Sequence, residues 1–140
     1  MNWSARLAAW GALLFLLGAV TGGYGASAMA GWISADVHMA LGAHVNGLLG
    51  GLWLAALGWS LAFVRLSDGQ LRAMALTAIV AAYANWFITG LKALWGVHGV
   101  VFGGSTANDL VAVGLHVFVV LPTLVSASLW AWGLRHQLRA

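Results

Sequence analysis

The charged residues of this chain are few, and long uncharged apolar stretches separate them. Among 140 residues there are six Lys and Arg, three Asp and no Glu, while 62% of the residues are hydrophobic. Charged residues make up 6% of the chain, against about 25% in a typical soluble domain. Because a charged side chain is costly in hydrocarbon, these stretches predict helices that span a membrane.

Four such stretches predict four spans within a single all-α domain, residues 1–140. The predicted spans are about 7–24, 36–64, 72–95 and 109–134. Asp36 and Asp109 stand at the starts of the second and fourth spans as predicted N-caps. The glycine-rich residues 22–25 predict a frayed or kinked end of the first span, and Pro122 predicts a kink in the fourth. We therefore expect an integral membrane four-helix bundle.

The basic residues predict the orientation, because Lys and Arg concentrate on the cytoplasmic side of membrane proteins. Five arginines flank the same side of the four spans: Arg6, Arg65, Arg72, Arg135 and Arg139. Both termini are therefore expected in the cytoplasm, in a multi-pass protein of the inner (cytoplasmic) membrane. So few basic residues do not indicate a nucleic-acid partner. The absence of cysteine excludes disulfides and covalent CxxCH haem attachment.

Three of the predicted spans carry polar side chains at a similar depth in the outer leaflet. At roughly 1.5 Å rise per residue, His44, Asn85 and His116 lie about 10–12 Å below the outer ends of their spans, and Tyr83 lies about 3 Å deeper than Asn85. Polar groups in a membrane protein usually face the interior of the bundle. The common depth therefore predicts a shared site.

Glycines follow His44 along one face of its helix. Gly47, Gly51 and Gly58 lie three, seven and fourteen residues after it, which places them on one stripe. The stripe has two interpretations: close helix packing of the GxxxG kind, or a smooth wall for a flat cofactor beside its axial histidine. A haem needs such an imidazole. His44 is thus a candidate metal ligand and Gly47 and Gly51 are candidate cofactor contacts, whereas His116 fits either a cofactor contact or a packing residue.

Two segments resemble a known family of membrane enzymes, the hydroxylaminobenzene mutases. Residues 43–51, AHVNGLLGG, resemble the second-span motif of these enzymes, which reads roughly AHLEGxxNG. Tyr83-Ala84-Asn85-Trp86, continuing to Trp95-Gly96, resembles their YANW…WG segment. Length and the four-span layout are also similar, so the resemblance covers most of the chain. Styrene oxide isomerases show a more distant resemblance.

The resemblance to the isomerases implies non-covalent haem b with His44 as its axial ligand, in a homotrimer with the haem near the subunit interface. The sequence departs from both families at the site. The substrate-positioning asparagine of the isomerases, like the asparagine of the mutase motif, falls on Gly50, and the active-site tyrosine of the isomerases falls on Thr89. The resemblance therefore leaves the substrate open.

Our first hypothesis is a membrane isomerase or mutase that rearranges a small apolar aromatic substrate: an arylhydroxylamine to an aminophenol or, alternatively, an epoxide to an aldehyde. Ferric haem on His44 would act as a Lewis acid. Asn85 would orient the substrate, and Tyr83 or Thr89 would donate a hydrogen bond to developing charge. A second hypothesis is a b-type cytochrome with one haem between His44 and His116. A third is a structural subunit without a cofactor, in which the glycines serve only helix packing.

Overall fold

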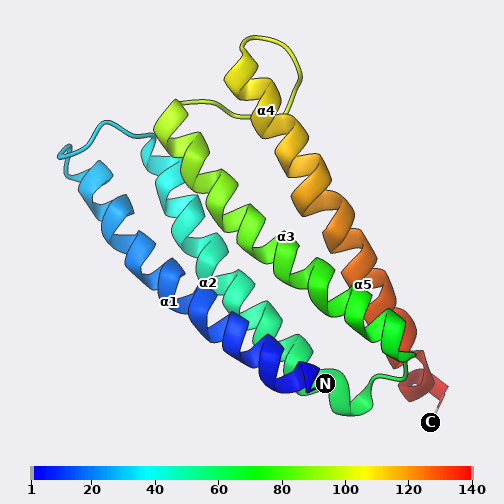
Figure 1. Cartoon of the computed structure of the whole chain (residues 1–140). Helices are drawn as coiled ribbons and strands as arrows, with labels where there is room; N and C mark the ends of the chain where they lie inside the picture. Colours follow the sequence, from blue (N-terminus) through cyan, green and yellow to red (C-terminus); the bar gives the residue numbers. More distant parts are fainter. Residues whose placement is uncertain (1, 140) are drawn as a thin grey trace.

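The computed structural model describes residues 2–139, with side chains for 2–137, and its regular elements are all helices joined by short connections. The elements are α1 (Trp3–Met29), α2 (Val37–Ser60), η1 (Leu61–Phe63), α3 (Asp68–Trp95), α4 (Thr106–Gly114), the π-helical η2 (Leu115–Val120), α5 (Leu121–Leu134) and η3 (Arg135–Arg139) (Figure 1). The all-α prediction is confirmed. The predicted topology signal at Arg139 lies outside the described side chains.

Four helical stretches are long and apolar enough to cross a membrane, as predicted for a multi-pass membrane protein. They are Trp3–Met29, Val37–Phe63, Asp68–Trp95 and Thr106–Gln137, so that α4, η2 and α5 form one continuous last span. The first and last helices place the two chain ends at the same end of the molecule (Figure 1). The cytoplasmic location of that end stays a prediction.

The helix boundaries follow from local capping. Asp36 caps α2 as predicted, because its carboxylate accepts the backbone N–H three residues later at 2.8 Å. The predicted cap at Asp109 is wrong. Ser105 accepts the N–H of Asn108 at 3.2 Å and starts the helix, while Asp109 lies in the first turn and accepts the N–H of Gly103 at 2.8 Å. Serine and aspartate are both favoured caps, so the earlier serine begins the helix.

The glycine-rich segment 22–25 does not end α1, contrary to the prediction. The helix runs through it to Met29, and Gly22 and Gly25 let α2 approach closely: a Cβ on Gly25 would lie 3.0 Å from the Leu41 side chain. The irregularity that Pro122 predicts is present as the π-helical segment that immediately precedes α5. Such π-turns accommodate backbone groups that a proline leaves without their usual partner.

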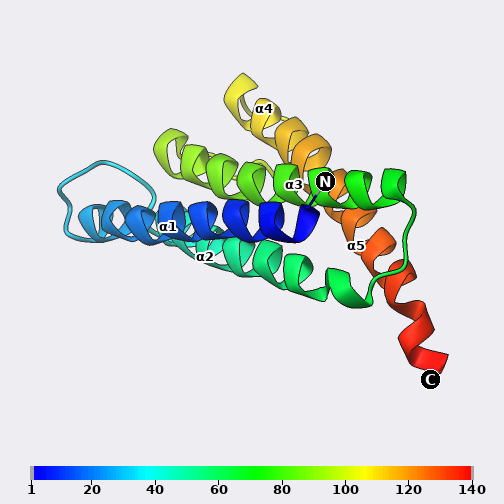
Figure 2. The same ribbon diagram turned by 60° about the horizontal axis from the view of Figure 1, so that its bottom comes forward.

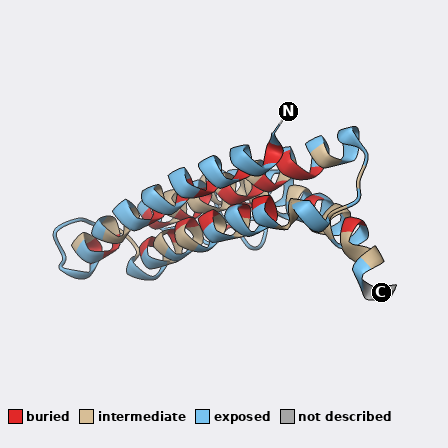
Figure 3. Cartoon of the chain, turned by 90° about the horizontal axis from the view of Figure 1, so that it is seen from below, coloured by how far each residue is buried: buried red, intermediate tan, exposed pale blue. Residues whose placement is uncertain are grey.

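The three first spans run side by side, and the last span lies on the far side of α3 from α1 (Figure 1) and crosses α3 at an angle (Figure 2). The core is built from apolar side chains that the helices enclose between them, the largest being Leu7, Leu14, Leu54, Leu57 and Met74. Buried positions line the facing sides of the helices, while the outer faces are exposed (Figure 3). The fold is therefore a three-helix core with a fourth helix packed mainly on α3, rather than an evenly packed bundle.

The last span contacts α2 near Ser60. The Trp130 indole N–H donates to the Ser60 hydroxyl at 2.9 Å, and its ring lies edge-on to Trp53 with ring centroids 5.0 Å apart. The backbone N–H of Arg65 also donates to the carbonyl of Gly133 at 3.0 Å. Farther along the two helices, the space between them is an open cleft over α3.

Candidate functional site

The His44 imidazole lies at the contact between α1 and α2. Its Nδ1 is 2.7 Å from the carbonyl oxygen of Gly18, and a Cβ placed on Gly22 would lie 3.1 Å from the ring. Because a carbonyl oxygen only accepts hydrogen bonds, Nδ1 carries the proton. In that tautomer the lone pair lies on Nε2, which has no hydrogen-bond partner within the described part of the chain.

This arrangement fits the axial ligand of a haem. Metal-bound histidines usually donate their second ring N–H to a carbonyl or carboxylate, which fixes the tautomer and the ring orientation. His44 is half-buried, and Leu41 and Val45 beside it are 37% and 45% exposed. Within residues 2–139, no three His, Cys, Asp or Glu side chains lie close enough to hold a metal ion together. A group that needs one histidine suits this site better than a bare metal ion.

The glycine stripe after His44 packs against α1 in this chain, so the structure favours helix packing at Gly47 and Gly51, and their contact with a cofactor stays a prediction. A Cβ on Gly51 would lie 2.7 Å from the carbonyl oxygen of Gly11, and one on Gly47 would collide with Gly18. Gly58 continues the same contact toward Ser4 and Leu7. The stripe meets glycines of α1 backbone to backbone, as small residues do in membrane helix pairs.

A cleft of about 410 Å³ opens on the other side of α2, between α2, α3 and the last span. Its lining comprises Asn46, Leu49, Gly50, Trp53, Ala81, Ala82, Asn85, Val119, Thr123 and Ala127. Asn46 donates from Nδ2 to the Thr89 hydroxyl at 3.0 Å. The Asn85 carboxamide has no hydrogen-bond partner among the side chains that the structure describes. Two carboxamides in a mainly apolar cleft can orient a small polar group.

The four polar side chains of common depth do not converge within the chain, so the predicted shared site is not formed there. Asn85 lines the cleft, and buried Thr89 reaches it only through Asn46. The Tyr83 hydroxyl instead donates to the carbonyl of Trp10 at 2.9 Å, with the two rings edge-on at 5.6 Å. Tyr83 therefore joins α3 to α1 and is not placed to donate to a substrate in the cleft.

His116 lies on the exposed side of the last span. Its Nδ1 donates to the carbonyl of Ala112 at 2.7 Å, and its ring stacks on Phe102 of the loop between α3 and α4, with centroids 6.0 Å apart. The segment that carries it packs on α3, α4 and α5, whereas His44 lies between α1 and α2. The structure therefore does not bring the two histidines together as ligands of one haem in a single chain.

Asn46 is a cleft residue that was not among the predicted site residues, although the sequence indicates that it faces away from His44 and can bridge to another helix. It lies two residues after His44, so it projects about 200° around the helix and faces away from the histidine. That spacing predicts that Asn46 lies on the face of α2 opposite His44, but it does not predict which helix packs against that face. The signal available in the sequence was a carboxamide in an uncharged span, where polar side chains are usually functional.

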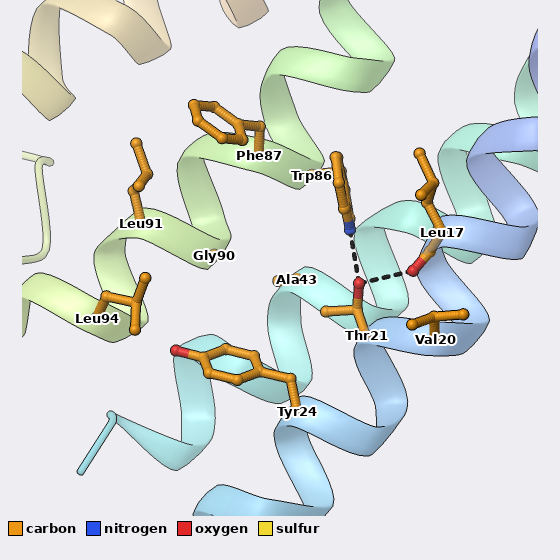
Figure 4. Close-up of a pocket in the computed structure, with 10 residues that line it drawn as sticks. All are labelled: Leu17, Val20, Thr21, Tyr24, Ala43, Trp86, Phe87, Gly90, Leu91 and Leu94. Carbon is orange, nitrogen blue, oxygen red and sulfur yellow. Dashed lines mark hydrogen bonds between the residues drawn. The ribbon is translucent and has the colours of Figure 1, made fainter. Parts of the chain in front are cut away.

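A second groove, of about 350 Å³, lies between α1 and α3 over Ala43 (Figure 4). The Trp86 indole N–H donates to the Thr21 hydroxyl at 2.9 Å, and that hydroxyl donates to the carbonyl of Leu17 at 2.7 Å. The Tyr24 hydroxyl is buried and has no hydrogen-bond partner among the described residues. The Trp86 N–H and the Thr21 hydroxyl are thus already hydrogen-bonded within the chain, and the Tyr24 hydroxyl is buried. The groove can therefore hold an apolar ring but presents no available polar group to orient a ligand.

Comparison with known proteins identifies the family. The sequence profile of the styrene oxide isomerase family matches residues 3–135. The chain belongs to this family. A curated relative, the hydroxylaminobenzene mutase HabB of Ectopseudomonas oleovorans, is 34% identical over 138 aligned residues that cover 93% of this chain and 80% of the relative. No solved structure matches significantly. The resemblance to both groups of enzymes is confirmed, and the chain is a membrane isomerase or mutase of this type.

Gly50 lines the cleft between α2, α3 and the last span. A Cβ there would lie 3.0 Å from the end of the Leu14 side chain and 3.4 Å from Ala82. The position thus lines the cleft without contributing a polar group, although the mutase motif carries asparagine there. The carboxamides of this cleft are those of Asn46 and Asn85.

Proposed function

We propose that this protein is a haem-dependent mutase of the inner membrane that converts a small arylhydroxylamine into an aminophenol. The substrate class is inferred from the HabB relative, which is named for hydroxylaminobenzene and matches 93% of the chain. The observation that carries the proposal is the His44 ring, whose Nδ1 is held by the Gly18 carbonyl at 2.7 Å while Nε2 stays free to bind iron. The cofactor is haem b, bound without a covalent link.

The proposed reaction is an isomerisation and needs no external oxidant or reductant. The N–O bond of the hydroxylamine breaks, a C–O bond forms on the ring, the ring carbon releases a proton, and the nitrogen takes one up. The difficult step is the departure of oxygen from nitrogen, which leaves an electron-poor aromatic ring. Ferric haem, when bound, supplies a Lewis acid for that oxygen.

The protein groups that would act on the substrate are those of the cleft. Its apolar walls accept the aromatic ring from the bilayer and keep bulk water away from a cationic intermediate. Asn85, with both ends of its carboxamide free, orients the polar end of the substrate. Thr89 acts indirectly by holding Asn46 at 3.0 Å.

The proposed active site combines two copies of the chain. His44 meets α1 on one side of α2, and the cleft opens on the other side, so His44 and Asn85 of the same chain would serve different sites. In a head-to-tail ring, the His44 face of one copy would meet the cleft of the next. A homotrimer is such a ring.

The test is an absorption spectrum of the detergent-purified protein, alone and after addition of phenylhydroxylamine, with product analysis. We expect a Soret band that the substrate perturbs and the appearance of aminophenol. His44→Ala should lose both haem and activity, whereas His116→Ala, the matched control, should keep haem. Full haem content and full activity in His44→Ala would refute the proposal. Turnover of styrene oxide without turnover of phenylhydroxylamine would favour epoxide isomerisation instead.

A further inference from the structure

Asn46 presents one half of its carboxamide to the cleft and uses the other half within the chain. Its Nδ2 donates to the hydroxyl of Thr89 at 3.0 Å. Thr89 is only 7% exposed on α3, so this hydrogen bond fixes the orientation of the amide. Oδ1 has no partner within residues 2–137. The group available at this point of the cleft is therefore a hydrogen-bond acceptor.

An acceptor without a partner is unfavourable in a membrane span, because lipid tails offer no hydrogen-bond donor. The neighbouring residues of the cleft do not relieve it. Gly50, one turn later on the same face of α2, has no side chain, and Trp53 directs its ring to Trp130. Asn46 thus carries an unused acceptor into the cleft proposed to bind the substrate.

We propose that Asn46 determines specificity by accepting a hydrogen bond from the N–H or O–H of the substrate. This inference rests on the proposed function and deepens it. An arylhydroxylamine carries two such donors, whereas an aryl epoxide carries none. The cleft therefore favours substrates that can donate a hydrogen bond to Asn46. Asn85, which can both donate and accept, forms hydrogen bonds with the other polar groups of the substrate.

A purely structural role of Asn46 makes a different prediction. If the amide only joined α2 to α3, then Thr89→Val, which removes the partner, should have the same effect as Asn46→Leu, which removes the amide. If Oδ1 binds the substrate, Asn46→Leu should change the preference between the ligands more than Thr89→Val does. Both variants lose the same interhelical hydrogen bond, so each serves as the stability control for the other.

The experiment compares phenylhydroxylamine with its N,O-dimethyl derivative, in which methyl groups replace both donor hydrogens. Binding to the detergent-purified protein is measured by thermal shift, and kcat and KM are measured for phenylhydroxylamine. The wild type should prefer phenylhydroxylamine. Asn46→Leu should reduce this preference about tenfold, as expected for one lost hydrogen bond to a buried acceptor, and should raise KM. Thr89→Val keeps Oδ1 but frees the amide to turn, so it should lose part of the preference, and less than Asn46→Leu loses.

A rescue variant tests whether the position of the amide matters. Adding Gly50→Asn to Asn46→Leu returns a carboxamide to the same helix face one turn later, and should restore part of the preference. Should Asn46→Leu fail to fold, Asn46→Ala removes the amide without adding bulk. An unchanged preference in these variants, or an equal loss for both ligands, would overturn the inference. If the wild type does not turn over phenylhydroxylamine, the proposed function fails, while the binding preference still tests Asn46.

Discussion

Replacing Gly18 by alanine is expected to separate α1 from α2 and to release the His44 ring. A Cβ at Gly18 would lie 2.5 Å from the backbone nitrogen of Leu48 and 2.6 Å from the carbonyl carbon of Gly47. Both neighbours are backbone atoms, which cannot move aside by changing a rotamer. Ordinary contact begins at 3.4 Å, so the helices must move apart by about 0.9 Å at this point.

The cost follows from two effects. Overpacking of a well-packed contact costs about 1–3 kcal/mol. The same displacement lengthens the Nδ1–carbonyl distance of His44, now 2.7 Å, by up to about 0.9 Å, beyond hydrogen-bond range. Loss of that hydrogen bond costs about 1 kcal/mol more, so the free energy of unfolding should fall by about 2–4 kcal/mol in total.

The assay is unfolding by SDS titration in mixed micelles, followed by helical circular dichroism. Gly23→Ala is the matched control, because it lies in the same helix and its Cβ would meet nothing within 4 Å. Nitrogen NMR of the imidazole should also show His44 losing its fixed Nδ1–H tautomer only in Gly18→Ala. Equal stability of the two variants would show that backbone contact at Gly18 does not hold the helices together, and would refute the reasoning.

Three further outcomes are expected elsewhere in the chain. Ser60→Ala removes the acceptor of the Trp130 indole N–H, 2.9 Å away, and should lower stability in the same titration by about 1 kcal/mol; no change would mean that the ring contact alone closes this end of the cleft. Because the chain lacks cysteine, Ser67→Cys and Ser105→Cys can report topology, and an impermeant maleimide added to intact spheroplasts should label only Ser105→Cys if the termini are cytoplasmic. Asn108→Ala removes hydrogen bonds that fold the loop between α3 and α4 onto its helix, two of them 2.8 Å long, so limited proteolysis should cut this loop faster than in the wild type.

The sequence predicts the membrane spans well, because hydropathy and charge act on whole segments. It predicts their ends less well, because several residues near a boundary can serve as caps. Asp36 caps its helix as predicted, but Ser105 begins the last span four residues before Asp109. The predicted helix end at residues 22–25 is wrong, because glycine weakens a helix in water but permits close helix contact in a membrane. Gly22 and Gly25 make that contact with α2.

The candidate site shows a sharper limit of prediction. Counting residues along a helix gives the depth of a side chain, and His44 and Asn85 do lie on neighbouring spans. Their directions depend on which helix each face meets, and that is decided by packing across the whole molecule. His44 turns to α1 because the glycine stripe of α2 meets glycines of α1. Asn46 therefore faces the cleft, where it donates a hydrogen bond to the Thr89 hydroxyl.

Opposite placement of His44 and the cleft leads to a complementation prediction. Neither His44→Ala nor Asn85→Leu should be active alone, since each destroys one half of every site. Each site of the proposed ring combines His44 of one copy with the cleft of the next. In a mixed trimer, an intact site therefore forms wherever an Asn85→Leu copy, which keeps His44, precedes a His44→Ala copy, which keeps Asn85.

The size of the recovery is set by counting. With equal co-expression and random assembly, about three quarters of the trimers contain both variants. Each of these mixed trimers has about one intact site in three. The expected activity is therefore about a quarter of the wild-type activity. A site contained within one chain predicts no recovery, because every chain then carries one of the two lesions. Activity in the mixed preparation, measured against each variant expressed alone at the same membrane level, therefore separates a shared site from a single-chain site without knowledge of the haem geometry.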